Sequence, residues 1–377
     1  MFNAHIAEQL AAVRRNIESA RTLPTIAYCE REWFAREKQE IFLKSWLMVG
    51  RAEQVPDIGD FFTVDVAGES ILVARGNDGK VRAFSPTCRH RGTIVAEGKG
   101  NVRTFVCPYH RWTYSLEGEL IGAPDMKRCP NFDKSAFPLI DIACDQWEGF
   151  VFVNLAKPPR QTLKEQLADL PNEIRKYRIA DMRFARERRY LLNCNWKSYM
   201  DNSVEAYHVS SVHGKSLEPV APMSIWESEV RDGYYLLWAE FAGTLGVLKD
   251  EKGFPPIPGL HLDRPERHTL AIMLPNTVLS LTVDAMWWVT LLPIDAERTE
   301  VIVNHAFPKD VRSLPDYETI AERYFRRFDI VNKEDNEIVE IQHRGILQAL
   351  REPGPYAPKE QLLHAFARYV ADAVAPC

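Results

Sequence analysis

Short runs of alternating apolar and polar residues fill the chain from Trp46 to about Asn154. Turns rich in Gly, Asp and Asn separate the runs, and NDG at 77–79 and EG at 117–118 are typical of hairpins. The runs are FFTVDVAG, SILVARG, VRAFSP, RTFVCPYH, WTYSLEGEL and GFVFVNL. A period of two with such punctuation predicts antiparallel strands. We therefore expect a small all-β domain over residues 42–156.

A different pattern follows KPPRQTLKEQLADLP at 157–171, which mixes proline with charge and is expected to link into a second region. That region holds helical stretches and apolar strand-like runs at 196–213, 234–243, 269–294, 299–308, 314–350 and 358–374. Strands bracketed by helices predict an α+β fold, with helices on one face of an antiparallel sheet. We expect this second domain to span 157–377, with the amphipathic segment 1–41 packed on it as helix. A chain of 377 residues is long enough for two such domains.

Composition narrows the function classes. The chain is 46% apolar and 26% charged, with a net charge of −5 and no basic block, which argues against a nucleic-acid surface. No apolar run approaches the roughly 20 residues of a membrane span, and the N-terminus lacks a signal-peptide core. Seven cysteines, an odd number spread along the chain, do not form a disulfide framework. These features predict a cytoplasmic protein that binds neither nucleic acid nor membrane.

The segment CRHRGTIVAEGKGNVRTFVCPYH contains two mixed pairs, Cys88 with His90 and Cys107 with His110. A structural zinc site more often groups Cys with Cys and His with His. Two matched Cys-first pairs suit a Rieske 2Fe–2S cluster, in which two thiolates hold one iron and two imidazoles hold the other. Zinc binding and chance remain as alternatives. We predict an electron-relay site.

A second group of candidate ligands lies in NWKSYMDNSVEAYHVSSVH at 195–213. His208 and His213 are five positions apart, which on an unbroken helix puts them about 140° apart around the axis. The helix must therefore loosen or end between them, and the serines at 210–211 allow this. The alternative is a plain helix with surface histidines. Asp201 and Glu205, in the same stretch, are candidate catalytic carboxylates.

Two histidines and one carboxylate form the facial triad of non-haem Fe(II) oxygenases. A third ligand is then needed from elsewhere, and the late helix 328–350 offers Asp329, Glu334, Asp335 and Glu337. Asp335 shares a helix face with Ile338, Val339, Gln342 and Ile346, which looks like the buried face. We predict Asp335 as the ligand, with Glu334 as the alternative.

The motifs C-x-H and C-x-x-H, then N-W-K, then D-N-x-x-E-x-Y-H-x-x-x-x-H, then a late acid, resemble one family over nearly the whole chain. That family is the oxygenase α-subunits of the Rieske non-haem iron ring-hydroxylating oxygenases. The resemblance implies an N-terminal all-β Rieske domain and a helix-grip, START-like catalytic domain with a central antiparallel sheet. It also implies a head-to-tail homotrimer, in which electrons pass from the cluster of one subunit to the iron of its neighbour.

The resemblance assigns ligands position by position. Cys88 and Cys107 hold the outer iron of the cluster, and His90 and His110 hold the inner one. The mononuclear Fe(II) falls to His208, His213 and Asp335. The family's bridging carboxylate, often Asp, falls on Glu205, where it would accept hydrogen bonds from His208 and from His110 across the subunit boundary. Glutamate at this position resembles the carnitine and glycine-betaine branch, which hydroxylates an N-methyl carbon.

Three functions follow from these features. The first is a monooxygenase acting on an N-alkyl or O-alkyl carbon of a small organic substrate with O2. The second is an arene dioxygenase that makes a cis-diol, and the third is a non-catalytic electron carrier. Aromatic residues that could surround a cationic substrate are Trp226, Tyr234, Tyr235, Trp238, Trp287 and Trp288. The chain lacks a G-x-G-x-x-G after a strand, so NADH or NADPH is expected to supply electrons through a separate reductase, with or without a ferredoxin.

Overall fold

The structure, a computed structural model, describes residues 4–376. The chain forms two compact units: one is Phe42–Leu163, and the other combines the chain up to Ile41 with the chain from Lys164 onward. The sequence predicted the second junction at 156/157, whereas the units divide at 163/164. The segment between these points remains attached to the first unit because the indole N–H of Trp46 donates to the Gln161 carbonyl at 2.8 Å.

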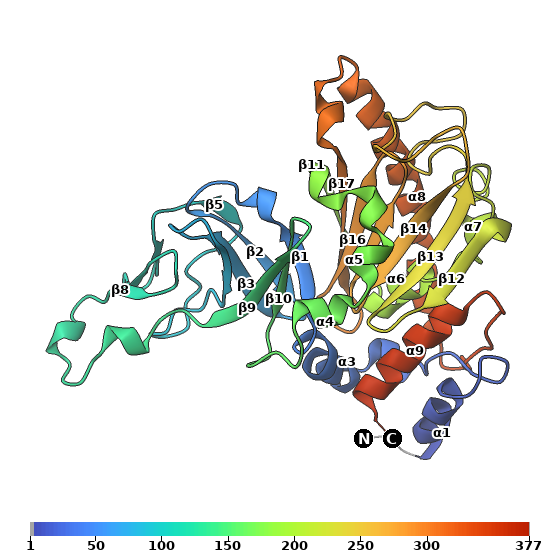
Figure 1. The fold of residues 1–377 in the computed structure, drawn as a ribbon. Coiled ribbons are helices and arrows are strands. Elements are labelled where there is room, and N and C mark those ends of the chain that lie inside the picture. Colours follow the sequence, from blue (N-terminus) through green and yellow to red (C-terminus); the bar gives the residue numbers. More distant parts are fainter. Residues whose placement is uncertain (1–3, 377) are drawn as a thin grey trace. The chain divides into compact units, whose positions relative to one another are not determined.

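A seven-stranded antiparallel sheet forms the frame of the unit Phe42–Leu163 (Figure 1). In sheet order its strands are β1 (Leu47–Arg51), β10 (Phe150–Asn154), β9 (Asp141–Trp147), β4 (Val81–Phe84), β3 (Glu69–Arg75), β2 (Asp60–Val66) and β5 (Lys99–Asn101). A smaller sheet consists of β6 (Phe105–Val106), β7 (Thr113–Tyr114) and β8 (Leu120–Gly122). Short 3-10 turns lie at Ala52–Gln54, Met126–Arg128 and Lys134–Ala136. The predicted all-β architecture is confirmed.

The other unit is built on a second seven-stranded antiparallel sheet. Its order is β11 (Met182–Leu192), β17 (Thr299–Pro308), β16 (Met286–Pro293), β15 (Thr277–Leu281), β14 (Glu266–Met273), β13 (Tyr234–Phe241) and β12 (Trp226–Val230). The apolar stretch 269–294 therefore folds back on itself to supply β14, β15 and β16. The predicted α+β class with a central antiparallel sheet is confirmed.

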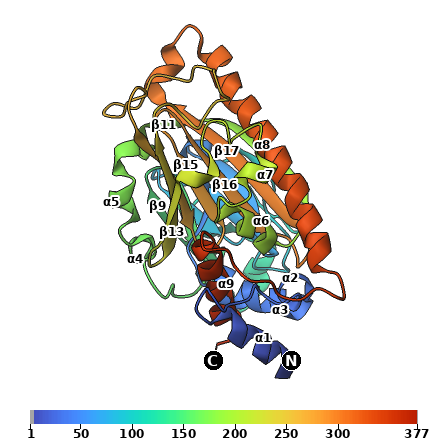
Figure 2. The ribbon, with the colours of Figure 1, turned by 90° about the vertical axis from the view of Figure 1, so that its right-hand side faces the viewer.

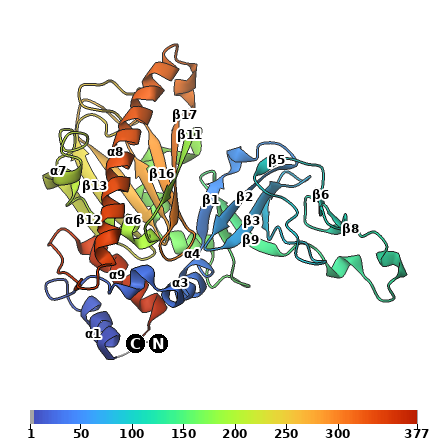
Figure 3. The ribbon, with the colours of Figure 1, turned by 180° about the vertical axis from the view of Figure 1, so that it is seen from behind.

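Helices pack around this second sheet. The longest, α8 (Tyr317–Ile346), crosses one face of it, as the view from behind shows (Figure 3). Phe328 of α8 contacts the rings of Trp287 on β16 and His305 on β17, with centroids 4.2 and 4.7 Å apart. Two short helices, α6 (Trp196–Ser203) and α7 (Val209–Val212), pack beside α8 (Figure 2). This contact of α6, α7 and α8 brings the predicted ligands together.

The first and last described helices pack together in the same unit. The helix α9 (Gln361–Val374) contacts β12, α1 (Ala4–Val13) and α3 (Arg31–Glu37). The remaining helical segments are α2 (Ile26–Cys29), a π-helical turn (Lys38–Phe42), α4 (Leu163–Leu167), α5 (Leu170–Glu173), and 3-10 turns at Arg175–Tyr177, Ile179–Asp181, Met223–Ile225 and Lys309–Ser313. None of the helices within 4–376 has both the length and the apolar character needed to cross a lipid bilayer.

Candidate metal centres

Two loops of the first unit, at 88–93 and 107–112, have the same backbone conformation. In each, the cysteine N–H donates to the carbonyl five residues later, and the cysteine carbonyl accepts from the N–H four residues later. The bonds are Cys88 to Thr93 at 2.9 Å, Gly92 to Cys88 at 3.0 Å, Cys107 to Trp112 at 2.7 Å and Arg111 to Cys107 at 3.0 Å. Gly92 and Arg111 both adopt a positive φ, of 81° and 61°. The matched sequence pairs therefore fold as two copies of one loop.

These loops direct their histidines toward each other. The Nδ1 atoms of His90 and His110 lie 3.2 Å apart, with the ring planes at 77°. Trp112 stacks on His90 at a centroid distance of 4.9 Å, which fixes the ring. Two imidazole nitrogens that converge in this way can share one metal ion as ligands.

The cysteines of the same loops are buried, with Cys88 2% and Cys107 1% exposed. Burial acts to raise the pKa of the Cys107 thiol, but hydrogen bonds from the backbone N–H groups of Tyr109 and His110 lower that pKa overall. The Tyr114 hydroxyl lies 3.3 Å from the sulfur of Cys88. A metal-bound thiolate needs such donors, so the residues present fit two thiolate and two imidazole ligands.

The mononuclear candidates lie where the helix predicted at 196–213 is interrupted. The prediction that the helix ends between His208 and His213 is confirmed, because α7 ends at Val212, although the serines at 210–211 lie inside this short helix. A second break, not predicted, falls between Ser203 and Val209, where an oxygen of Glu205 accepts the backbone N–H groups of Tyr207 and His208. His208 and His213 therefore flank the two ends of the four-residue helix α7.

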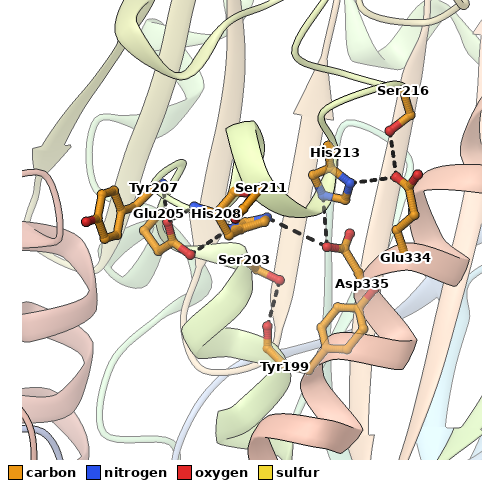
Figure 4. Close-up of polar contacts among 10 residues, drawn as sticks. All are labelled: Tyr199, Ser203, Glu205, Tyr207, His208, Ser211, His213, Ser216, Glu334 and Asp335. Atoms are coloured by element: carbon orange, nitrogen blue, oxygen red, sulfur yellow. Dashed lines mark hydrogen bonds and ion pairs between the residues drawn. The ribbon is translucent and has the colours of Figure 1, made fainter.

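Figure 4 shows both imidazoles turned toward Asp335 of α8. The Nε2 atoms of His213 and His208 lie 3.0 and 3.7 Å from Asp335 Oδ1. Each of the three residues offers one ligand atom within 4.8 Å of the others. Asp335 Oδ1 is buried and has no hydrogen bond of good geometry to another described residue. A buried carboxylate oxygen in this position fits a shared cation, so the donor set fits a mononuclear iron.

Both histidines use their other nitrogen to contact a carboxylate (Figure 4). His208 Nδ1 lies 2.5 Å from Glu205 Oε1, and His213 Nδ1 lies 2.8 Å from Glu334 Oε2. The Ser216 hydroxyl also donates to Glu334, at 2.5 Å. Carboxylates that accept from Nδ1–H fix the tautomer that leaves Nε2 free to bind metal. Burial acts to lower the pKa of His213, but the two carboxylates raise that pKa overall.

Sequence analysis considered Glu334 only as an alternative ligand and did not predict its contact with His213. The available signal was its position directly before Asp335. Asp201, in contrast, is outside the cavity wall: its Oδ2 accepts from the Tyr28 hydroxyl at 2.7 Å. Burial raises the pKa of Asp201 to about 7. Its catalytic role stays a prediction.

A cavity of about 110 Å³ adjoins the His208, His213 and Asp335 group. Much of its wall is apolar, including Leu217, Leu237, Leu270, Val278, Val289 and Val331. Trp226 and Trp287 also line it, whereas the other predicted aromatics do not. Trp288 follows Trp287 on β16 and so points to the opposite face of the sheet. Trp238 stacks instead under the Arg267 guanidinium, at 4.0 Å.

Family models match both units. Residues 179–376, more than half of the chain, match the ring hydroxylating alpha subunit (catalytic domain), and residues 45–133 match the Rieske [2Fe-2S] domain. The chain belongs to the ring-hydroxylating alpha subunits. It is thus the terminal oxygenase component of a Rieske non-haem iron oxygenase, and its cofactors are a Rieske cluster and a mononuclear iron.

Curated relatives agree with this family. The glycine betaine monooxygenase oxygenase subunit of Pseudomonas aeruginosa is 29% identical over 92% of this chain and 87% of the relative. The carnitine monooxygenase oxygenase subunit of Escherichia coli is 31% identical over 56% of this chain and 58% of the relative. The chloroplastic choline monooxygenase of Arabidopsis thaliana is 26% identical over 93% of this chain and 82% of the relative.

Solved structures share the fold. A quaternary ammonium Rieske monooxygenase superposes with a TM-score of 0.83 at 24% identity, covering 95% of this chain and 96% of that one. Naphthalene 1,2-dioxygenase from Rhodococcus superposes with a TM-score of 0.78 at 19% identity, covering 99% of both. The same fold therefore serves enzymes with different products.

Proposed function

We propose that this oxygenase hydroxylates an N-alkyl or O-alkyl carbon, giving an unstable hemiaminal or hemiacetal that releases an aldehyde. The observation that carries the proposal is the His208, His213 and Asp335 group at the wall of a small, largely apolar cavity. The likeness to glycine betaine and carnitine monooxygenase subunits supports an N-alkyl carbon. Glutamate at position 205, which by its resemblance to the family falls at the bridging carboxylate, supports the same branch.

The ligand assignments belong to this proposal. Cys88 and Cys107 hold one iron of the cluster, His90 and His110 hold the other, and His208, His213 and Asp335 hold the mononuclear iron. When bound, the mononuclear iron supplies the site at which dioxygen is reduced with electrons from the cluster. The chain's own contribution is to present Nε2 of both imidazoles, because Glu205 and Glu334 hold the Nδ1 protons. The apolar cavity wall excludes water from the substrate.

Electron supply completes the proposal. A separate reductase, with or without a ferredoxin, delivers electrons from NADH or NADPH, so the protein works in the cytoplasm, where these carriers are kept reduced. The protein is a homotrimer in which Glu205 accepts hydrogen bonds from His208 of its own chain and from His110 of the partner subunit. Glu205 Oε1 already accepts from His208, and carboxylate oxygens have lone pairs for further donors.

A second candidate function is cis-dihydroxylation of an aromatic ring. The apolar residues of the cavity wall favour it, because an arene needs such a surface. An electron carrier without catalysis is the third hypothesis, and it leaves the converging ligands of α7 and α8 without a role.

Single-turnover chemistry separates the three. The holoenzyme, reduced with dithionite, is mixed with oxygen-18 gas and a panel of N-methyl compounds and aromatic acids. The proposal expects an aldehyde and a dealkylated product in amounts close to the mononuclear iron content. A diol that contains both labelled atoms would establish the dioxygenase instead. A protein that binds a cluster but no mononuclear iron would be an electron carrier.

A further inference from the structure

Arg327 of α8 places a buried cation in the wall of the substrate cavity. The residue is 4% exposed and lines the same cavity as His208, His213 and Asp335. Its guanidinium carbon lies 4.4 Å from the Phe328 ring centroid and 5.5 Å from that of Trp287. The described residues, 4–376, provide it with no hydrogen bond and no ion pair. The group is therefore held between aromatic rings with its donors unused.

Nearby carboxylates do not serve as its counter-ions. Asp335 contacts the two histidines through Oδ1, and Glu334 accepts from His213 and Ser216. Neither approaches Arg327 within the 4.0 Å of an ion pair, although both favour its charged form from farther away. Burial lowers the pKa of Arg327 to about 10, so the side chain remains protonated near neutral pH.

Asn332, five residues and about 1.4 turns further along α8, adds a second unused donor. Its side chain is 4% exposed and lines the same cavity, and its amide nitrogen makes no hydrogen bond of good geometry among residues 4–376, although the Tyr190 hydroxyl lies near it. Buried donors in native proteins are nearly always satisfied, by protein, water or ligand. Five guanidinium N–H donors and an amide N–H that adjoin one cavity call for a ligand rich in acceptor oxygens.

We propose that the substrate carries a carboxylate, and that this group binds Arg327 and Asn332 while the alkyl carbon faces His208, His213 and Asp335. Only the position of the alkyl carbon rests on the proposed function; the carboxylate site does not. A guanidinium and a carboxylate match as a planar, two-point pair. The cavity of about 110 Å³ has room for a small acid.

Charge also excludes one class of substrate. The Trp287 face that could attract a quaternary ammonium group is already approached by Arg327. A cation without a carboxylate would bring a second positive charge into a cavity where the first is unpaired. A zwitterion, whose carboxylate neutralises Arg327 and whose ammonium lies at the other end, avoids this cost. Choline-like alcohols are therefore expected to bind poorly.

Binding to the oxidised holoenzyme under argon tests the inference without turnover. Calorimetry compares two matched pairs: glycine betaine with choline, and 4-methoxybenzoate with 4-methoxybenzamide. We expect at least one acid to bind about tenfold or more tightly than its neutral or cationic partner. Arg327→Met should weaken binding of that acid by about 100-fold, the scale for truncating one side of a buried charge pair. The affinity of Arg327→Lys for that acid should lie between those of the wild type and Arg327→Met, because lysine keeps the charge but lacks the planar two-point donor geometry of the guanidinium.

The neighbouring residue Arg326 provides a matched control. Arg326 is exposed and pairs with Glu251 at the surface, so Arg326→Met should leave acid binding unchanged. The unfolding temperature of the ligand-free variant separates a binding role of Arg327 from a structural role, because the two roles predict changes of opposite sign. Removal of a buried unpaired charge should raise the unfolding temperature of ligand-free Arg327→Met, whereas loss of a structural cation would lower it. The acid should raise the unfolding temperature of the wild type and not that of Arg327→Met.

Three results would overturn the inference. They are equal or tighter binding of both non-acid partners, wild-type acid binding by Arg327→Met and Arg327→Lys, and a lowered unfolding temperature for ligand-free Arg327→Met. Failure of the proposed function looks different. If acids bind through Arg327 but no aldehyde forms in single turnover, the carboxylate inference stands and the dealkylation proposal falls.

Discussion

Glu334 accepts the Nδ1–H of His213 at 2.8 Å, while the adjacent Asp335 lies 3.0 Å from the Nε2 atom of the same ring. Two consecutive acids of one helix thus contact opposite nitrogens of a single imidazole. This geometry supports separate roles for the two carboxylates: Asp335 faces the position proposed for iron, and Glu334 fixes the tautomer of His213.

Asp335→Ala should remove the mononuclear iron. It deletes one of three protein ligands, so affinity should fall by more than the roughly 10- to 100-fold typical of lost supporting contacts. Iron counting after dialysis and the visible absorption of the cluster measure the two centres separately. We expect the cluster to survive and turnover to vanish. If Asp335→Ala kept its iron and its turnover while Glu334→Ala lost both, the ligand would be Glu334 and not Asp335.

Glu334→Gln should weaken iron binding by about 10- to 100-fold without abolishing it. The amide oxygen can still accept from His213 or from Ser216, but the carboxylate charge that makes the imidazole a stronger ligand is gone. Titration of the iron-free protein with Fe(II) gives the affinity. An affinity equal to that of the wild type would reduce Glu334 to a packing residue.

Cys107→Ser should destroy the Rieske cluster and leave the mononuclear site able to bind Fe(II), because the two ligand sets share no residue. Electron paramagnetic resonance of the reduced protein and iron counting check both halves of this statement. Cys129→Ser is the control, since that thiol is exposed and belongs to neither ligand set. A normal Rieske signal from Cys107→Ser would refute the assignment of the two loops.

Glu205→Gln should slow electron transfer in protein loaded with both metal centres, and it should also weaken iron binding as Glu334→Gln does, because each change removes a carboxylate from the Nδ1 of one histidine. One oxygen of Glu205 accepts from His208 Nδ1 and the other accepts two backbone N–H groups. The amide nitrogen of Gln must therefore face a donor, at a cost of about 1–3 kcal/mol. In a single turnover with substrate and oxygen, the reduced cluster should reoxidise far more slowly. Wild-type reoxidation at full metal loading would remove the bridging role.

Asp201→Asn should change the pH dependence of stability. Burial raises the folded-state pKa of Asp201 from 3.8 to about 7, so the folded protein binds more protons than the unfolded chain between these values. Wild-type stability should fall as pH rises through that window, by about 4 kcal/mol at about 1.4 kcal/mol per pH unit. Asn can still accept from Tyr28 and carries no charge. Unfolding by denaturant at pH 5 and pH 8 should show a smaller difference in Asp201→Asn; an unchanged difference would contradict this.

The convergence of the candidate ligands within each motif could be predicted, because each motif lies within a short stretch of chain. Cys88 and His90, or His208 and His213, keep their spacing however the rest of the protein packs. The strand β11 was not predicted, since its sequence, MRFARERRYLL, is rich in Arg and most of the strand is only partly buried. Polarity at the edge of the sheet hides the period of two that marked its neighbours.

Contacts that depend on packing could not be predicted. Glu334 and Asp335 differ by about 100° around α8, and only the position of His213 against the helix decides what each one contacts. Arg327 offered a signal, because it shares a helix face with Val331 and Asp335 at four-residue spacing. A charge on a buried face indicates a partner, but the sequence alone does not say that the partner comes from outside the chain.

The candidate ligands of the mononuclear site lie on elements of very different length. Both histidines flank a four-residue helix in a stretch, 204–225, otherwise made mainly of turns, whereas Asp335 belongs to a helix of 30 residues packed on the sheet. A short local segment can open at a smaller free-energy cost than global unfolding. With the proposed ligands, opening this segment alone would admit iron to the finished fold, and bound iron would then join the segment to the long helix.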